Sequence, residues 1–193
     1  MSINLLETVQ KNLNYPPLQK IDPNTQRVVV DDTTPEEDKF SQAAIPAVLT
    51  ALYRFVQSDE GAATFLQGDN ATNWVSKIFD DNKKEAVQTI SAYALQSKAD
   101  PITKMNAIAN ETVNIVKTQL PANAGIKELK LFFNNQRSNI LLYLPATLNM
   151  GDLLHDETLD DNTNKMEGPI SSLMQSIGNA FSKPVTGDDV KNK

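Results

Sequence analysis

The stretch Thr34–Gln57, TPEEDKFSQAAIPAVLTALYRFVQ, constrains the fold more than any other part of the chain. Its first residues have the pattern of a helix start. Thr34 and Glu37 match a capping box, and Pro35 stands at the first helical position. From Ala44 onward apolar residues recur at helical spacing and cover most of the circumference. A helix of this kind is usually enclosed by other helices. The stretch therefore predicts the central helix of an all-α domain.

Pro46 lies inside this predicted helix. A proline there removes one amide donor and crowds the carbonyl of Gln42, which predicts a kink. The alternative is a break, with a new helix beginning at Pro46. A break would require Ile45 to act as the N-cap, and isoleucine is a weak capping residue, so we favour a kinked but continuous helix.

Shorter helical patterns flank the central stretch, and several begin at a recognisable cap. Apolar periodicity predicts helices over Ile3–Leu13, from Ser58 to Gly68, from an Asn70 cap to Phe79, from an Asn82–Glu85 capping box through Leu95, from Asp100-Pro101 to about Gln119, over Ile126–Phe133, and in a last core helix that contains Ile140 and Leu148 with Pro145 inside it. Together these elements predict a compact multi-helix bundle.

Two segments are not typical of regular helices. Residues 18–32 contain the turn signal Asp22-Pro23-Asn24 and the strand-like run Arg27–Val30, which has no obvious partner strand. We expect an extended connector there. Beyond residue 150 the chain becomes acidic and rich in turn-forming residues.

The composition change divides the chain into a predicted all-α domain, 1–150, and a second region, 151–193. The second region comprises an acidic linker, an amphipathic helix over 168–181 and a disordered tail from Pro184. The apolar stripe of the 168–181 helix predicts docking, either on its own domain or on a protein partner, and a tethered segment favours its own domain. Its stripe consists of Ile170, Leu173, Met174, Ile177 and Phe181.

Charge and composition exclude several classes of function. The chain has 193 residues, a formal charge of −6 and no cysteine, so disulfides and thiolate metal sites are absent. A net negative chain is repelled by nucleic acid, and no apolar run is long enough to span a membrane. The N-terminus lacks the pattern of a signal peptide, so we expect a cytoplasmic location.

His155 is the only histidine, and carboxylates surround it in the sequence at Asp152, Asp156, Asp160 and Asp161. One imidazole with scattered carboxylates does not define a set of metal ligands, so a solvated acidic loop is the favoured interpretation.

Asp160, Asn162 and Asn164 match the first ligands of a calcium loop. However, Lys165 and Ser171 occupy the positions where such a loop needs glycine and glutamate. We therefore predict no metal site, no cofactor site and no catalytic residues.

Two further clusters have structural interpretations. Trp74 and Phe79 have helical spacing typical of core packing rather than of a ligand-binding patch. Lys83 and Lys84, near Lys77, are flanked by acidic residues and indicate a solvated helix face.

The order of the small and apolar segments resembles the YidB-like bacterial helical proteins of unknown function. The corresponding stretches are Asn4–Val9, Ala44–Leu52, Ser58–Ala63, Trp74–Phe79 followed by Ala86–Ser91, and Asn135–Ile140 leading to Leu144-Pro145. Asp80 departs from the family pattern, which often has a glycine after the phenylalanine. The resemblance implies an all-α fold and a bacterial source, and it implies no catalytic residues.

The sequence therefore favours a non-enzymatic helical binding or scaffold protein, with the 168–181 helix as a contact for a protein partner. A DNA-binding protein of the helix-turn-helix type is the alternative, because short helices joined by tight turns permit that motif, and the acidic charge argues against it. An enzyme of unknown reaction ranks third, because no positioned nucleophile or base is recognisable.

Overall fold

The computed structural model describes residues 3–22, 34–94 and 100–159, and within these ranges every regular element is helical. The prediction of an all-α bundle is confirmed for this part of the chain. The run Arg27–Val30 and the segment 168–181 lie outside the described residues. The α-helices are α1 (Leu5–Asn12), α2 (Glu36–Phe55), α3 (Asp59–Gln67), α4 (Trp74–Phe79), α5 (Lys83–Tyr93), α6 (Pro101–Gln119), α7 (Ile126–Leu141) and α8 (Met150–Leu154); the 3-10 turns are η1 (Asp80–Asn82), η2 (Ala146–Leu148) and η3 (Glu157–Leu159).

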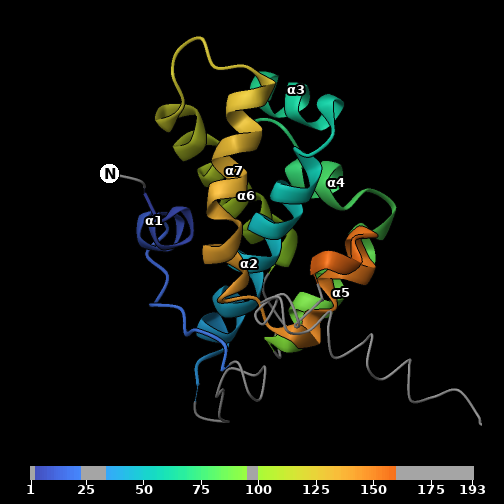
Figure 1. The fold of residues 1–193 in the computed structure, drawn as a ribbon. Coiled ribbons are helices and arrows are strands. Elements are labelled where there is room, and N and C mark those ends of the chain that lie inside the picture. The colour runs from blue at the N-terminus through green and yellow to red at the C-terminus, as the bar shows by residue number, and fades with distance from the viewer. Residues whose placement is uncertain (1–2, 23–33, 95–99, 160–193) are drawn as a thin grey trace, which may run out of the picture. The chain divides into compact units, whose positions relative to one another are not determined.

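Helix α2 is the centre of the bundle, as predicted. It packs against α1, α4, α5, α6, α7 and α8, and Figure 1 shows it passing between α7 and α4. All residues from Lys39 to Leu52 are buried. The apolar circumference of this helix is therefore covered on all sides.

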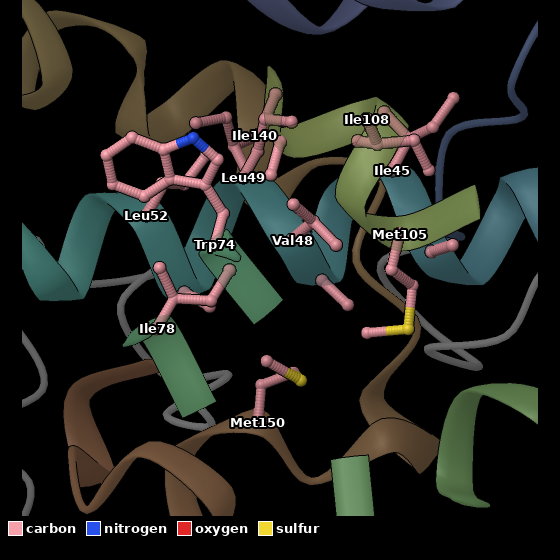
Figure 2. Close-up of a cluster of buried hydrophobic side chains, with 14 of the residues drawn as sticks. Ile45, Val48, Leu49, Leu52, Trp74, Ile78, Met105, Ile108, Ile140 and Met150 are labelled. Carbon is pink, nitrogen blue, oxygen red and sulfur yellow. The ribbon is translucent and has the colours of Figure 1, made fainter. Parts of the chain in front are cut away.

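The core forms where side chains of α2 meet those of the surrounding helices (Figure 2). Each fully buried aliphatic or aromatic side chain of this kind stabilises the fold by about 1.5–3 kcal/mol before conformational entropy is subtracted. The labelled members of the cluster are Ile45, Val48, Leu49, Leu52, Trp74, Ile78, Met105, Ile108, Ile140 and Met150.

Helix α2 continues through Pro46 without a break, so the alternative of two helices is excluded. The carbonyl of Pro46 accepts a hydrogen bond from the hydroxyl of Thr50 at 2.7 Å, one turn further along. This bond adds a side-chain donor to the helix just beyond the position where proline has removed a backbone donor.

The predicted capping box at the start of α2 is wrong. The N-cap residue is Pro35 rather than Thr34, and no side chain caps the helix. Glu37 instead forms an ion pair with Lys104 of α6 at 3.1 Å. The Pro35 carbonyl accepts from the amides of Asp38 and Lys39, so the first turn closes through the backbone.

Caps that need only local geometry are confirmed at α3 and α6. The Ser58 hydroxyl accepts from the Gly61 amide at 2.9 Å. The Asp100 carboxylate accepts hydrogen bonds from the amides of Ile102 and Thr103. These bonds lower the pKa of Asp100, and the hydrogen bond from the Thr103 hydroxyl has the largest effect. This cap therefore stabilises α6 above the unfolded-state pKa of aspartate, and its contribution is lost as the pH falls through the folded-state pKa.

The predicted N-cap at Asn70 is wrong. Helix α4 begins later, at Trp74, and Asn73 caps it by accepting a hydrogen bond from the Ser76 amide at 3.2 Å.

The predicted end of the 126–133 helix at Phe133 is also wrong, because α7 continues to Leu141. Pro145 does not lie inside a helix. It precedes η2, where its extended conformation ends the turn after α7.

Two buried glutamines bind backbone groups of distant segments, and neither contact was predicted from the sequence. The side-chain amide of Gln42 accepts from the Gln19 amide at 2.8 Å and donates to the Tyr143 carbonyl at 3.3 Å. The side chain of Gln136, on α7, accepts from the Leu5 amide at 3.0 Å. The bonds to Gln19 and Leu5 attach the N-terminal segment to the bundle.

The close approach of α3 to the end of α2 requires glycine at position 61. A β-carbon there would lie 2.0 Å from the carbonyl oxygen of Phe55 and 2.8 Å from Oγ of Ser58. Replacing a helical glycine with alanine normally stabilises a protein by about 1 kcal/mol. In Gly61→Ala we expect the opposite sign, a loss of about 1–3 kcal/mol, because the backbone must shift.

Chemical denaturation measures this change in the free energy of unfolding. Ala63→Gly in the same helix is the control, with an expected loss of about 1 kcal/mol from helix propensity alone. A Gly61→Ala variant more stable than the parent would show that α3 does not lie this close to α2.

Candidate functional site

A cavity of about 320 Å³ lies where the C-terminal end of α2, the corner between α4 and α5, and the end of α8 meet. Its walls combine apolar and ionisable side chains from three separate parts of the sequence. The lining residues are Arg54, Phe55, Ser58, Ile78, Phe79, Asp80, Asp81, Asn82, Leu153, Leu154 and His155. This volume is at the lower end of the range for small-molecule sites.

The first wall is positioned by the turn from α2 to α3. The hydroxyl of Ser58 donates to the Phe55 carbonyl at 3.2 Å while it accepts from the Gly61 amide. The same turn places Arg54 at the cavity, where its Nε atom lies 3.3 Å from Oδ2 of Asp156. This contact is an ion pair without hydrogen-bond geometry.

The second wall is the corner between α4 and α5. Asp80 has φ 43° and ψ −122°, a backbone conformation that is favourable only for glycine. A non-glycine residue in such a region costs about 1–3 kcal/mol. Glycine would adopt this conformation without that cost.

Asn82 joins the corner to α8, and the predicted Asn82–Glu85 capping box is wrong. Asn82 does precede α5, but its side chain makes no cap. Its Nδ2 atom donates to the Leu153 carbonyl at 2.9 Å and lies 3.3 Å from Nε2 of His155. The preceding turn η1 already supplies an acceptor for the Lys83 amide, so the side chain of Asn82 is available for a tertiary contact.

The third wall ends at His155, where the sequence predicted an irregular acidic loop. That prediction is wrong for the first part of the loop, because residues 150–154 form α8, and Leu153 and Leu154 are buried. His155 ends the helix in the left-handed conformation, with φ 51°. The Asp156 amide then bonds to the Gly151 carbonyl at 2.8 Å, which holds the turn beside Arg54.

A second hollow adjoins this turn and is lined by Gly151, Asp152, His155 and Asp156. The structure thus brings together His155 and the two nearer carboxylates that the sequence singled out. Within residues 3–22, 34–94 and 100–159, no three histidine, aspartate or glutamate side chains are arranged to hold a metal ion. Asp160, Asp161 and the calcium-like positions after them lie outside the described residues.

The aromatic cluster takes the core-packing role predicted for it, and the basic cluster is solvated at Lys77 and Lys84 but not at Lys83. Trp74 is completely buried, and Phe79 is a core residue that also reaches the cavity wall. Lys84 is exposed, whereas the Lys83 ammonium donates to the Ser76 hydroxyl at 3.1 Å. Across the described helices, none combines the length and apolarity needed to cross a membrane.

The Asn82 contact predicts a local effect on α8. Replacing Asn82 with alanine removes the donor to the Leu153 carbonyl, so we expect a loss of about 1 kcal/mol in the local stability of α8. The backbone amides of Leu153, His155 and Asp156 should then exchange with solvent about five to tenfold faster in hydrogen-exchange measurements. Asn135→Ala, at an exposed position of α7, is the matched control. Unchanged exchange in α8 would contradict the contact.

Comparison with known proteins gave no match to a protein-family model, a curated protein or a solved structure. The resemblance to YidB-like proteins, and the bacterial source and cytoplasmic location expected with it, therefore stay predictions from the sequence.

Proposed function

We propose that this protein is a non-enzymatic helical binding or scaffold protein whose recognition site is the cavity between α2, the α4–α5 corner and α8. The observation that carries the proposal is the composition of the walls. Five apolar side chains and six polar or ionisable ones line the same space, so the cavity offers a ligand both apolar contact and polar groups. The apolar walls are Phe55, Ile78, Phe79, Leu153 and Leu154.

The polar groups of the cavity support binding more than catalysis. The Ser58 hydroxyl is engaged as a helix cap, and Nε2 of His155 lies against the side-chain amide of Asn82 rather than against a hydroxyl nucleophile. Arg54 is paired with Asp156. General acid–base or nucleophilic catalysis needs a base within reach of the group that it activates, and these side chains contact structural partners instead.

A fragment screen by nuclear magnetic resonance tests the proposal. Fragments that bind should perturb the backbone amides of Asp81, Asn82 and His155 together, because these residues line one space. The Asp81→Trp variant places a large side chain at an exposed position of the wall and should abolish those perturbations. Glu85→Trp is the matched control, because Glu85 is also acidic and exposed but lies outside the cavity.

Two outcomes would refute the proposed site. The first is a screen in which no fragment perturbs these amides. The second is a set of hits that bind the Asp81→Trp variant as well as they bind the parent.

We also propose that the amphipathic segment 168–181 docks through its apolar stripe, either on its own domain or on a protein partner. If the segment docks on its own domain, deletion of residues 168–193 should lower the midpoint of thermal unfolding and increase the binding of an apolar dye. An unchanged midpoint would instead favour a separate protein partner that binds Leu173 and Phe181. The two results therefore distinguish docking on the protein's own domain from docking on a partner.

A further inference from the structure

The carboxylates at the cavity outnumber the cationic groups available to them. Asp80 and Asp81 line the cavity and are exposed, and the described residues provide no hydrogen bond or ion pair to either side chain. The guanidinium of Arg54 is the basic group of the wall, and Asp156 already pairs with it. A ligand that enters this space therefore meets an unbalanced negative charge.

The nearby lysines do not cancel this charge within the cavity. Lys77, Lys83 and Lys84 belong to the same stretch of sequence, but none of them lines the cavity. Lys83 is directed to the Ser76 hydroxyl of α4.

The rest of the wall favours an organic cation over a metal ion. A hard divalent cation requires about six oxygen ligands, and the described residues contain no group of three metal-binding side chains. The half-buried ring of Phe55 instead offers apolar surface beside the carboxylates, whereas Phe79 and Leu153 are buried in the core. Aromatic faces also attract ammonium and guanidinium groups.

We infer that the cavity binds an ammonium or guanidinium group carried on an apolar stem, with the charge at Asp80 and Asp81 and the stem against Phe55. The inference rests on the proposed function, because it assigns a ligand class to the same cavity. Such a group occurs in free amines and in the side chains of lysine and arginine. The shared chemistry is the cation and its stem.

The conformation of Asp80 provides a variant that separates binding from folding. Asp80→Gly removes one carboxylate and also relieves the backbone conformation at φ 43°. We expect this variant to unfold about 2–4 °C higher than the parent, because glycine adopts that conformation without strain. A loss of binding in a more stable protein cannot be attributed to unfolding.

Titration at low ionic strength with three probes tests the inference. Agmatine represents a free cation, Nα-acetyl-arginine methylamide represents a side chain in a peptide, and the citrulline analogue of the second probe has the same shape without the charge. At least one of the two cationic probes should bind about tenfold more tightly than the citrulline probe and perturb the Asp81 and His155 amides. The stronger of the two identifies the source of the cation.

The variants complete the test. Asp80→Gly and Asp81→Asn should each weaken the cationic probes several-fold, whereas Glu85→Gln, outside the cavity, should not. Equal binding of the citrulline probe would overturn the inference and leave the proposed binding function intact. Fragments that bind the cavity while both cationic probes fail would lead to the same conclusion. Absence of all binding at these amides would overturn both.

Discussion

Replacing Trp74 with alanine is expected to lower the free energy of unfolding by about 3–5 kcal/mol. Trp74 is completely buried, and its ring packs against Phe55 at a centroid distance of 6.5 Å and against Phe65 at 5.7 Å. Figure 2 shows the indole next to the side chains of α2. Since small domains have a total stability of about 5–15 kcal/mol, a large part of it would be lost.

Urea denaturation measures this loss, and two variants make the result specific. Leu131→Ala removes a large side chain that is 58% exposed, so its effect should stay within about 0.5 kcal/mol. Trp74→Phe keeps an aromatic ring and removes an indole N–H that has no hydrogen-bond partner in the described structure. We therefore expect Trp74→Phe to cost less than half as much as Trp74→Ala. A Trp74→Ala variant within 1 kcal/mol of the parent would show that the core can close around the missing ring.

The elements that the sequence predicted best depend on interactions close along the chain. Apolar periodicity located α2 and α6, and the caps at Ser58 and Asp100 formed because each needs a hydrogen bond across only two or three residues. The apolar circumference of α2 also predicted its central position correctly, because such a surface has to be covered by neighbouring helices.

Local capping chemistry gave wrong predictions where a tertiary partner competes for the same side chain. Asn82 bonds to the carbonyl of Leu153, 71 positions away, and Glu37 pairs with Lys104, 67 positions away. A capping pattern in the sequence indicates only that a local hydrogen bond between side chain and backbone can form. The fold decides whether a distant acceptor or donor offers a better one.

The candidate cavity could not be predicted because its walls come from three distant parts of the chain. The sequence analysis singled out His155 and its acidic neighbours but not Asn82, which the structure also places beside the imidazole.

The last prediction concerns Gln136, which binds the start of α1. Its side-chain amide accepts from the Leu5 amide and donates to the Ile3 carbonyl, both at 3.0 Å. A glutamine side chain has the same donor and acceptor as a peptide group, so it can satisfy both backbone groups at once. Gln136→Leu would leave a buried N–H and a half-buried carbonyl unpaired.

Leaving these groups unpaired is expected to cost about 2–4 kcal/mol, mainly because the buried Leu5 N–H loses its partner without access to bulk water. The loss should be concentrated at α1, so the Leu5 amide should exchange with solvent much faster in native-state hydrogen exchange while the amides of α6 change little. Gln88→Leu, at an exposed position of α5, introduces the same change in composition and should leave both measurements near the parent values. If the two variants behaved alike, the attachment of α1 would depend on its apolar contacts through Leu6 and Val9 and not on Gln136.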